Sequence, residues 1–223
     1  MTQHSVPDHS ETVRKLVTRL DEMKDGTLQM PVTFGPVFVL LALATGHDAS
    51  VRPVYGACDA AAQALCVAQP GGYVITKQSR RSLPPRTFGS DFPDGAAPRY
   101  AYVHVAEHGM VEIVAGGIAD NAYGLVGLGA ITKSIREHDA EALRAAFDAL
   151  GVDGPLMVAV ALLRTRGTPV VGGGTPEDAG VLGASYVTID PHRFASRLAL
   201  DAENLNRLVN DLWTKVSNGE PTA

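Results

Sequence analysis

Aromatic residues are scarce in this sequence of 223 residues, making up 6% of the chain. Small aliphatic side chains must therefore build most of the core, and hydrophobic residues at 45% are numerous enough to do so. Long hydrophobic runs are also missing. The two longest, 36–44 and 155–163, have about nine residues each, against roughly 20 for a helix that spans a bilayer. We expect both runs to lie inside a folded core.

An excess of positive charge is missing as well, because the formal net charge is −5. A surface of that sign repels phosphate polyanions on average, so we do not expect a nucleic-acid partner. The densest basic run, 77–86, could contact phosphate, but no recognisable nucleic-acid-binding module surrounds it. Residues 1–10 lack the basic start and apolar stretch of a signal peptide. We therefore expect a cytoplasmic protein without a membrane partner.

Motifs for metal, cofactor and nucleophile chemistry are not found. Cys58 and Cys66 flank a run of helical character, and eight helical residues separate their Cα atoms by about 12 Å, too far for a disulfide. Closely spaced Cys and His ligands are missing, so no metal site is predicted. The glycines of 124–129 have the reverse of the dinucleotide-binding spacing, and neither a Walker loop nor a G-x-S-x-G elbow occurs. The sequence therefore does not indicate which cofactor, if any, the protein binds, and the cofactor is left as unknown.

Helical periodicity predicts helices over 10–23, 139–150 and 201–216, and alanine-rich composition favours another over 59–68. Asp139 is expected to cap the second of these helices. The apolar stripe of the first consists of Val13, Leu16, Val17, Leu20 and Met23. The last helix has its stripe at Leu205, Leu208, Val209, Leu212 and Val216, with Trp213 at its edge.

Strands are predicted over 72–76, 156–163 and 184–189, where short apolar or alternating runs end at polar or turn residues. The Gly-Pro start of 155–164 leaves a helix open as the alternative there. Residues 36–45 are ambiguous. Their Gly-Pro start favours a buried helix and their β-branched residues favour a strand; of the two, we expect the helix. Residues 77–99 are expected to form a long connection without periodicity.

The clearest local pattern is a β-hairpin that turns at His108 and Gly109. With a two-residue loop, Tyr102 and His104 share one face with Val111 and its alternate neighbours, and Glu112 lies on the other. His104 and Glu112 could then not line one pocket. A three-residue loop would change this pairing.

Together these segments predict an α+β fold, a single domain over 1–223 with frayed tails at 1–9 and 218–223. The sheet is expected to be mostly antiparallel, with four or five strands and flanking helices. Because no motif specifies a reaction, we expect a non-catalytic interaction or regulatory domain that binds a protein partner or a second copy of itself.

The alternative is a small-molecule enzyme or ligand-binding protein, with a pocket between the sheet and the glycine-rich loops. Catalytic candidates are the titratable residues His104, Glu112, Asp190 and His192. Ligand-binding candidates are Gly172, Gly173, Gly174 and Tyr102, since the N–H groups of a glycine loop can cradle an anion. Whether the protein is an enzyme is left open.

Overall fold

A computed structural model of the chain describes residues 9–33, 35–45, 53–76, 85–90, 99–120, 125–126, 128–170 and 180–217. The expected tails, except for His9, lie outside these residues, as do Gly172, Gly173 and Gly174.

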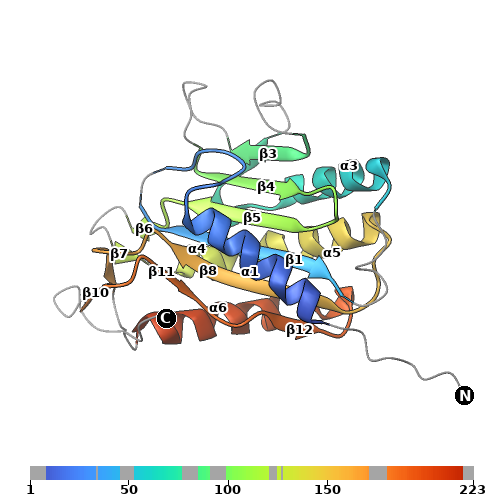
Figure 1. The fold of residues 1–223 in the computed structure, drawn as a ribbon. Helices are drawn as coiled ribbons and strands as arrows, with labels where there is room; N and C mark the ends of the chain where they lie inside the picture. Colours follow the sequence, from blue (N-terminus) through green and yellow to red (C-terminus); the bar gives the residue numbers. More distant parts are fainter. Residues whose placement is uncertain are drawn as a thin grey trace, which may run out of the picture.

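An antiparallel sheet runs through the molecule (Figure 1), with the strand order β11-β8-β1-β5-β4-β3-β2 and with β12 also paired to β8. Its strands are β1 (Val37–Ala44), β2 (Ile75–Thr76), β3 (Thr87–Ser90), β4 (Ala101–Val105), β5 (Val111–Gly116), β8 (Leu156–Leu163), β11 (Tyr186–Thr188) and β12 (His192–Phe194). A smaller sheet in the order β10-β9-β7-β6 joins β6 (Ala119–Asp120), β7 (Leu125–Val126), β9 (Pro169–Val170) and β10 (Gly180–Val181).

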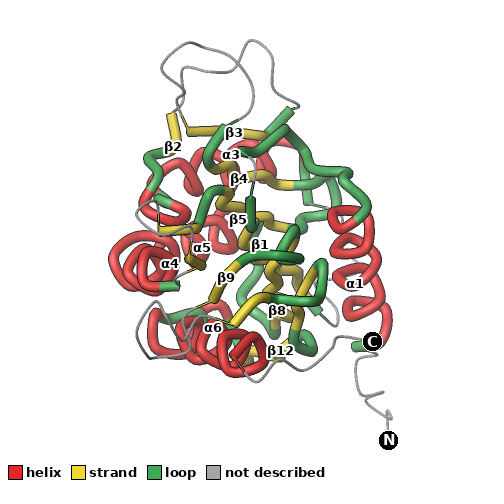
Figure 2. The backbone as a smooth tube through the Cα atoms, turned by 90° about the vertical axis from the view of Figure 1, so that its left-hand side faces the viewer, coloured by secondary structure: helices red, strands yellow, loops and turns green. Residues whose placement is uncertain are grey.

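Helices cover both faces of the large sheet (Figure 2). Of the helices in the described part of the chain, α1 (Ser10–Lys24) covers one face, over β1 and β8. The other face carries α3 (Tyr55–Ala64), α4 (Gly129–Ser134), α5 (Ala140–Ala149) and α6 (Ala202–Ser217). A π-helical turn (Ile135–Asp139) joins α4 to α5, and short 3-10 turns lie at Leu65–Val67, Pro70–Gly72 and Arg197–Ala199. Within the described ranges, no helix has the length and apolar character needed to cross a bilayer.

The α+β class is confirmed, but the expected count of four or five strands was too low. In the large sheet two short strands were missed, because β3 lies inside the predicted connection 77–99 and β12 follows the expected stop at Pro191. The four two-residue strands of the smaller sheet were not predicted either. A further error concerns 36–45, where Val37–Ala44 form strand β1 between β5 and β8 rather than a helix. All eight residues of β1 are buried, so the alternation that marks a strand is absent from its sequence.

The hairpin of β4 and β5 is confirmed, but its predicted register was wrong. The N–H of Ala106 donates to the carbonyl of Met110 at 2.8 Å, which closes a three-residue loop in which Gly109 has φ +82°. His104 is consequently paired with Glu112. Because directly opposed residues of an antiparallel pair point to the same side, these two side chains share one face of the sheet.

Two helical expectations also need correction. Val17 is 42% exposed, and Thr12 and Arg19 are buried on α1 in addition to Leu16, Leu20 and Met23. Asp139 does not cap the N-terminus of α5 with its side chain, because the helical backbone continues through this residue from the π-helical turn. Its buried carboxyl group accepts the N–H of Gln69 at 2.8 Å and lies 2.6 Å from Oγ of Ser134, which also donates to the carbonyl of Gln69. All five stripe residues predicted for α6 are buried.

Candidate functional site

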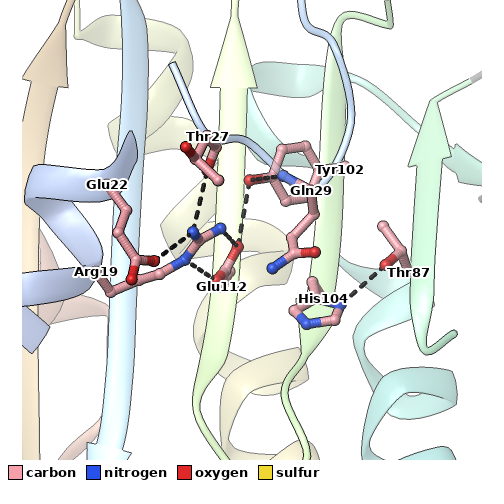
Figure 3. A network of polar contacts seen from close by, with 8 residues as sticks. All are labelled: Arg19, Glu22, Thr27, Gln29, Thr87, Tyr102, His104 and Glu112. Atoms are coloured by element: carbon pink, nitrogen blue, oxygen red, sulfur yellow. Dashed lines mark hydrogen bonds and ion pairs between the residues drawn. The ribbon is translucent and has the colours of Figure 1, made fainter. Parts of the chain in front are cut away.

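A buried ion pair joins α1 to the middle of the sheet (Figure 3). Arg19 is 9% exposed and Glu112 is 1% exposed. Nε of Arg19 donates to Oε1 of Glu112 at 2.6 Å, and Nη2 donates to Oε2 at 3.3 Å. Nη1 donates to Oε2 of Glu22 and to the carbonyl of Thr27, both at 3.0 Å. One guanidinium therefore ties α1 and the segment after it to β5.

Tyr102 extends this contact on the neighbouring strand β4. Its hydroxyl donates to Oε2 of Glu112 at 3.2 Å and accepts the N–H of Gln29 at 3.4 Å. Burial, followed by the nearby charge of Glu112, raises the pKa of Tyr102 well above its ordinary value, so the hydroxyl remains a donor. We call Arg19, Glu22, Tyr102 and Glu112 the Arg19 network.

The charge of Arg19 is permanent in this setting. Burial by itself lowers the pKa of Arg19, but the hydrogen bonds and negative charge of Glu112 outweigh burial and raise the pKa above its ordinary value. The network therefore holds a cation and a buried carboxylate side by side, in contact with a protonated phenol.

His104 lies beside the network, on the same face as Glu112. Its Nδ1 is 2.8 Å from Oγ1 of Thr87, and the side chain is buried. Burial and then the charges of Arg19 and Arg86 lower the pKa of His104 to about 4. The imidazole is therefore neutral at physiological pH, as expected for a hydrogen-bonded interior histidine.

A cleft of about 460 Å³ lies between α1 and the turn that joins β4 to β5. We call it the α1 cleft; it is lined by Arg14, Lys15, Thr18, Arg19, Glu22, Gln29, Ala106, His108, Met110 and Glu112. The α1 residues form two neighbouring rows, one with Arg14 and Thr18 and the other with Lys15, Arg19 and Glu22, because helical residues three or four apart stack on one face. Its volume is in the range of small-molecule sites.

Neither a protein-family model nor a curated protein nor a solved structure matches this chain. The site must therefore be interpreted from its own geometry. Among the described residues, no three His, Cys, Asp or Glu side chains are grouped so that they could hold a metal ion.

The candidate residues named from the sequence fall into separate places. Tyr102, His104 and Glu112 come together on one face, and Glu112 also lines the cleft. Asp190 and His192 lie by the opposite part of the sheet, next to β8, so β8 and β1 separate them from Glu112 on β5. Asp190 instead borders a second hollow of about 310 Å³ on the other side of α1.

Arg19 is the functional residue that sequence reasoning missed. It comes three positions after Leu16 and four before Met23, both of which are buried. Helical spacing alone therefore places Arg19 on the buried side of α1. A charged residue within a predicted apolar stripe was the signal that a buried partner should be sought.

Proposed function

We propose that the protein binds a small organic molecule in the α1 cleft. The observation that carries this proposal is the buried Arg19–Glu112 pair at the base of an open cleft of about 460 Å³. Removing two charges from water is costly, and packed apolar residues often give equal or greater stability in their place. Charged groups that are fixed next to a concave surface are typical of ligand sites.

Binding is favoured over catalysis because three of the four catalytic candidates, His104, Asp190 and His192, do not line the cleft. Tyr102 and His104 are absent from its lining residues and are buried beneath the surface. Of the catalytic candidates, Glu112 does line the cleft, but both of its oxygens accept hydrogen bonds from Arg19. This arrangement supports a ligand-binding role for the cleft.

The expectation of a self-associating interaction domain stays a prediction. Such a domain would need a contiguous exposed apolar surface of several hundred Å². The large apolar side chains that are exposed among the described residues come from several segments: Val17, Val54, Tyr55, Val67, Val74 and Leu198. They give no specific support to one interface.

The proposal is tested by thermal-shift screening of the full chain against a metabolite library. A ligand present at about 100 times its Kd stabilises the native state by about 2.7 kcal/mol. For a domain of this size, that corresponds to a rise in Tm of roughly 5–10 °C. Thr18→Trp places a large side chain in the cleft without changing charge, and it should abolish the rise for ligands that bind there.

Thr214→Trp is the matched control, because Thr214 is an exposed helical threonine on α6, across the sheet from α1. Ligands of the α1 cleft should stabilise Thr214→Trp as they stabilise the original protein. A library without any stabilising molecule, or stabilisation that persists in Thr18→Trp, contradicts the proposal.

A further inference from the structure

The charges in the α1 cleft do not balance, and this imbalance bears on the ligand that the proposed function requires. Both lining carboxylates, Glu22 and Glu112, accept hydrogen bonds from Arg19. Lys15 pairs with Glu11, its Nζ lying 3.0 Å from Oε1. Arg14 is exposed and forms no ion pair with any described residue. Among the charged lining residues that the structure describes, Arg14 is thus without an ion-pair partner.

Arg19 also has one N–H group without an acceptor among the described residues. A guanidinium has five N–H groups. The single N–H of Nε, both on Nη1 and one on Nη2 have acceptors in Glu112, Glu22 and the Thr27 carbonyl. The second N–H of Nη2 has no acceptor among the residues that the structure describes. This side chain is about nine-tenths buried and lines the cleft, so the remaining N–H is a donor available to an acceptor on a ligand that enters the cleft.

We infer that the ligand of the α1 cleft carries a carboxylate or phosphate group, which Arg14 binds at the rim and the free N–H of Arg19 binds at the base. Planar guanidinium groups suit both anions, since their N–H groups match the spacing of the oxygens. Ala106 and Met110 on the opposite wall offer apolar contact. An anion attached to a small apolar body therefore fits the cleft best.

The inference rests on the proposed function and is tested with three probes that share a phenyl ring: benzoate, phenyl phosphate and benzamide, the neutral isostere of benzoate. Each is titrated into the full chain while backbone amide resonances of 14–19 and 106–112 are followed by NMR. At least one anion should shift these resonances with an affinity at least tenfold higher than benzamide. Which anion binds more tightly distinguishes a carboxylate site from a phosphate site.

Arg14→Gln should weaken binding of that anion by about tenfold, because a hydrogen bond to a charged group is lost. Arg207→Gln makes the same change of charge on α6, where Arg207 is exposed and pairs only weakly, at 3.6 Å, with Glu203. It should leave the affinity unchanged. The net charge of the chain is −5, so general attraction of anions would not produce this difference.

Two results would overturn the inference: benzamide binding as tightly as both anions, or equal affinity of the anion for Arg14→Gln and the original protein. Neither result would remove the proposed function, because neutral molecules that stabilise the protein and fail with Thr18→Trp would still show a cleft that binds ligands. The proposed function itself is contradicted only if the thermal-shift screen finds no molecule that stabilises the protein, or if stabilisation persists in Thr18→Trp.

Discussion

Replacing Glu112 by alanine should destabilise the protein strongly, because it leaves a cation buried without its counterion. Arg19 would lose the acceptors of Nε and Nη2, and the hydroxyl of Tyr102 would lose its acceptor. Breaking one side of a buried ion pair costs about 3–5 kcal/mol. At roughly 2–4 °C per kcal/mol for a domain of this size, Tm should fall by about 6–20 °C.

The double variant Arg19→Met/Glu112→Leu separates the ion pair from simple loss of packing. It removes both charges and fills the space with apolar groups, a replacement that is often neutral or stabilising at buried pairs. We expect it to be at least about 2 kcal/mol more stable than Glu112→Ala, even though Tyr102 still lacks an acceptor. Urea unfolding at constant m measures both differences.

Glu22→Gln is the control, since Glu22 bonds to the same guanidinium but its side chain is 51% exposed. An exposed pair of this kind contributes about 0–1 kcal/mol. The reasoning is refuted if Glu112→Ala costs no more than Glu22→Gln, or if the double variant is less stable than Glu112→Ala.

Two further predictions concern pH. The pKa of His104 is lowered to about 4, chiefly by burial. His104 therefore takes up a proton at higher pH in the unfolded chain than in the folded protein. The free energy of unfolding should fall by up to about 3 kcal/mol as the pH is lowered from 6.5 to 4. His104→Asn should remove this pH dependence, which urea unfolding at each pH measures. Burial raises the pKa of the Asp139 carboxyl group in the folded protein. The protonated group therefore contributes fully to the free energy of unfolding at pH values below its pKa in the unfolded chain. That contribution is lost as the pH rises through its pKa in the folded protein. Asp139→Asn, whose amide can donate to Ser134 and accept from Gln69, should flatten that loss, and an unchanged pH profile would contradict it.

Local chemistry could predict the hairpin but not its register. Alternating apolar residues on both sides of Gly109 are sufficient to indicate two paired strands. The register depends on whether the loop has two residues or three, and a difference of one residue moves Glu112 to the other face. Because both faces of this hairpin are buried, its hydrophobic pattern does not choose between the alternatives.

The long apolar strands illustrate a related limit. Residues 36–44 and 155–163 have similar sequences, and the strands within them, β1 and β8, are fully buried and pair with each other along their whole length. Covering both faces of a sheet removes the period-two signal, so only length and β-branched content favour a strand. That evidence gave the right prediction for β8 and the wrong one for β1.

The site could not be predicted because its partners are 93 residues apart in the chain. No spacing rule links Arg19 to Glu112, and only the antiparallel register brings His104 beside them. The same contacts fix α1 to the sheet, so substitutions at Arg19 or Glu112 change stability and ligand binding together. Arg14 and Thr18 line the cleft from outside the Arg19 network. Loss of binding in their variants, with Tm unchanged, is therefore the result that separates function from folding.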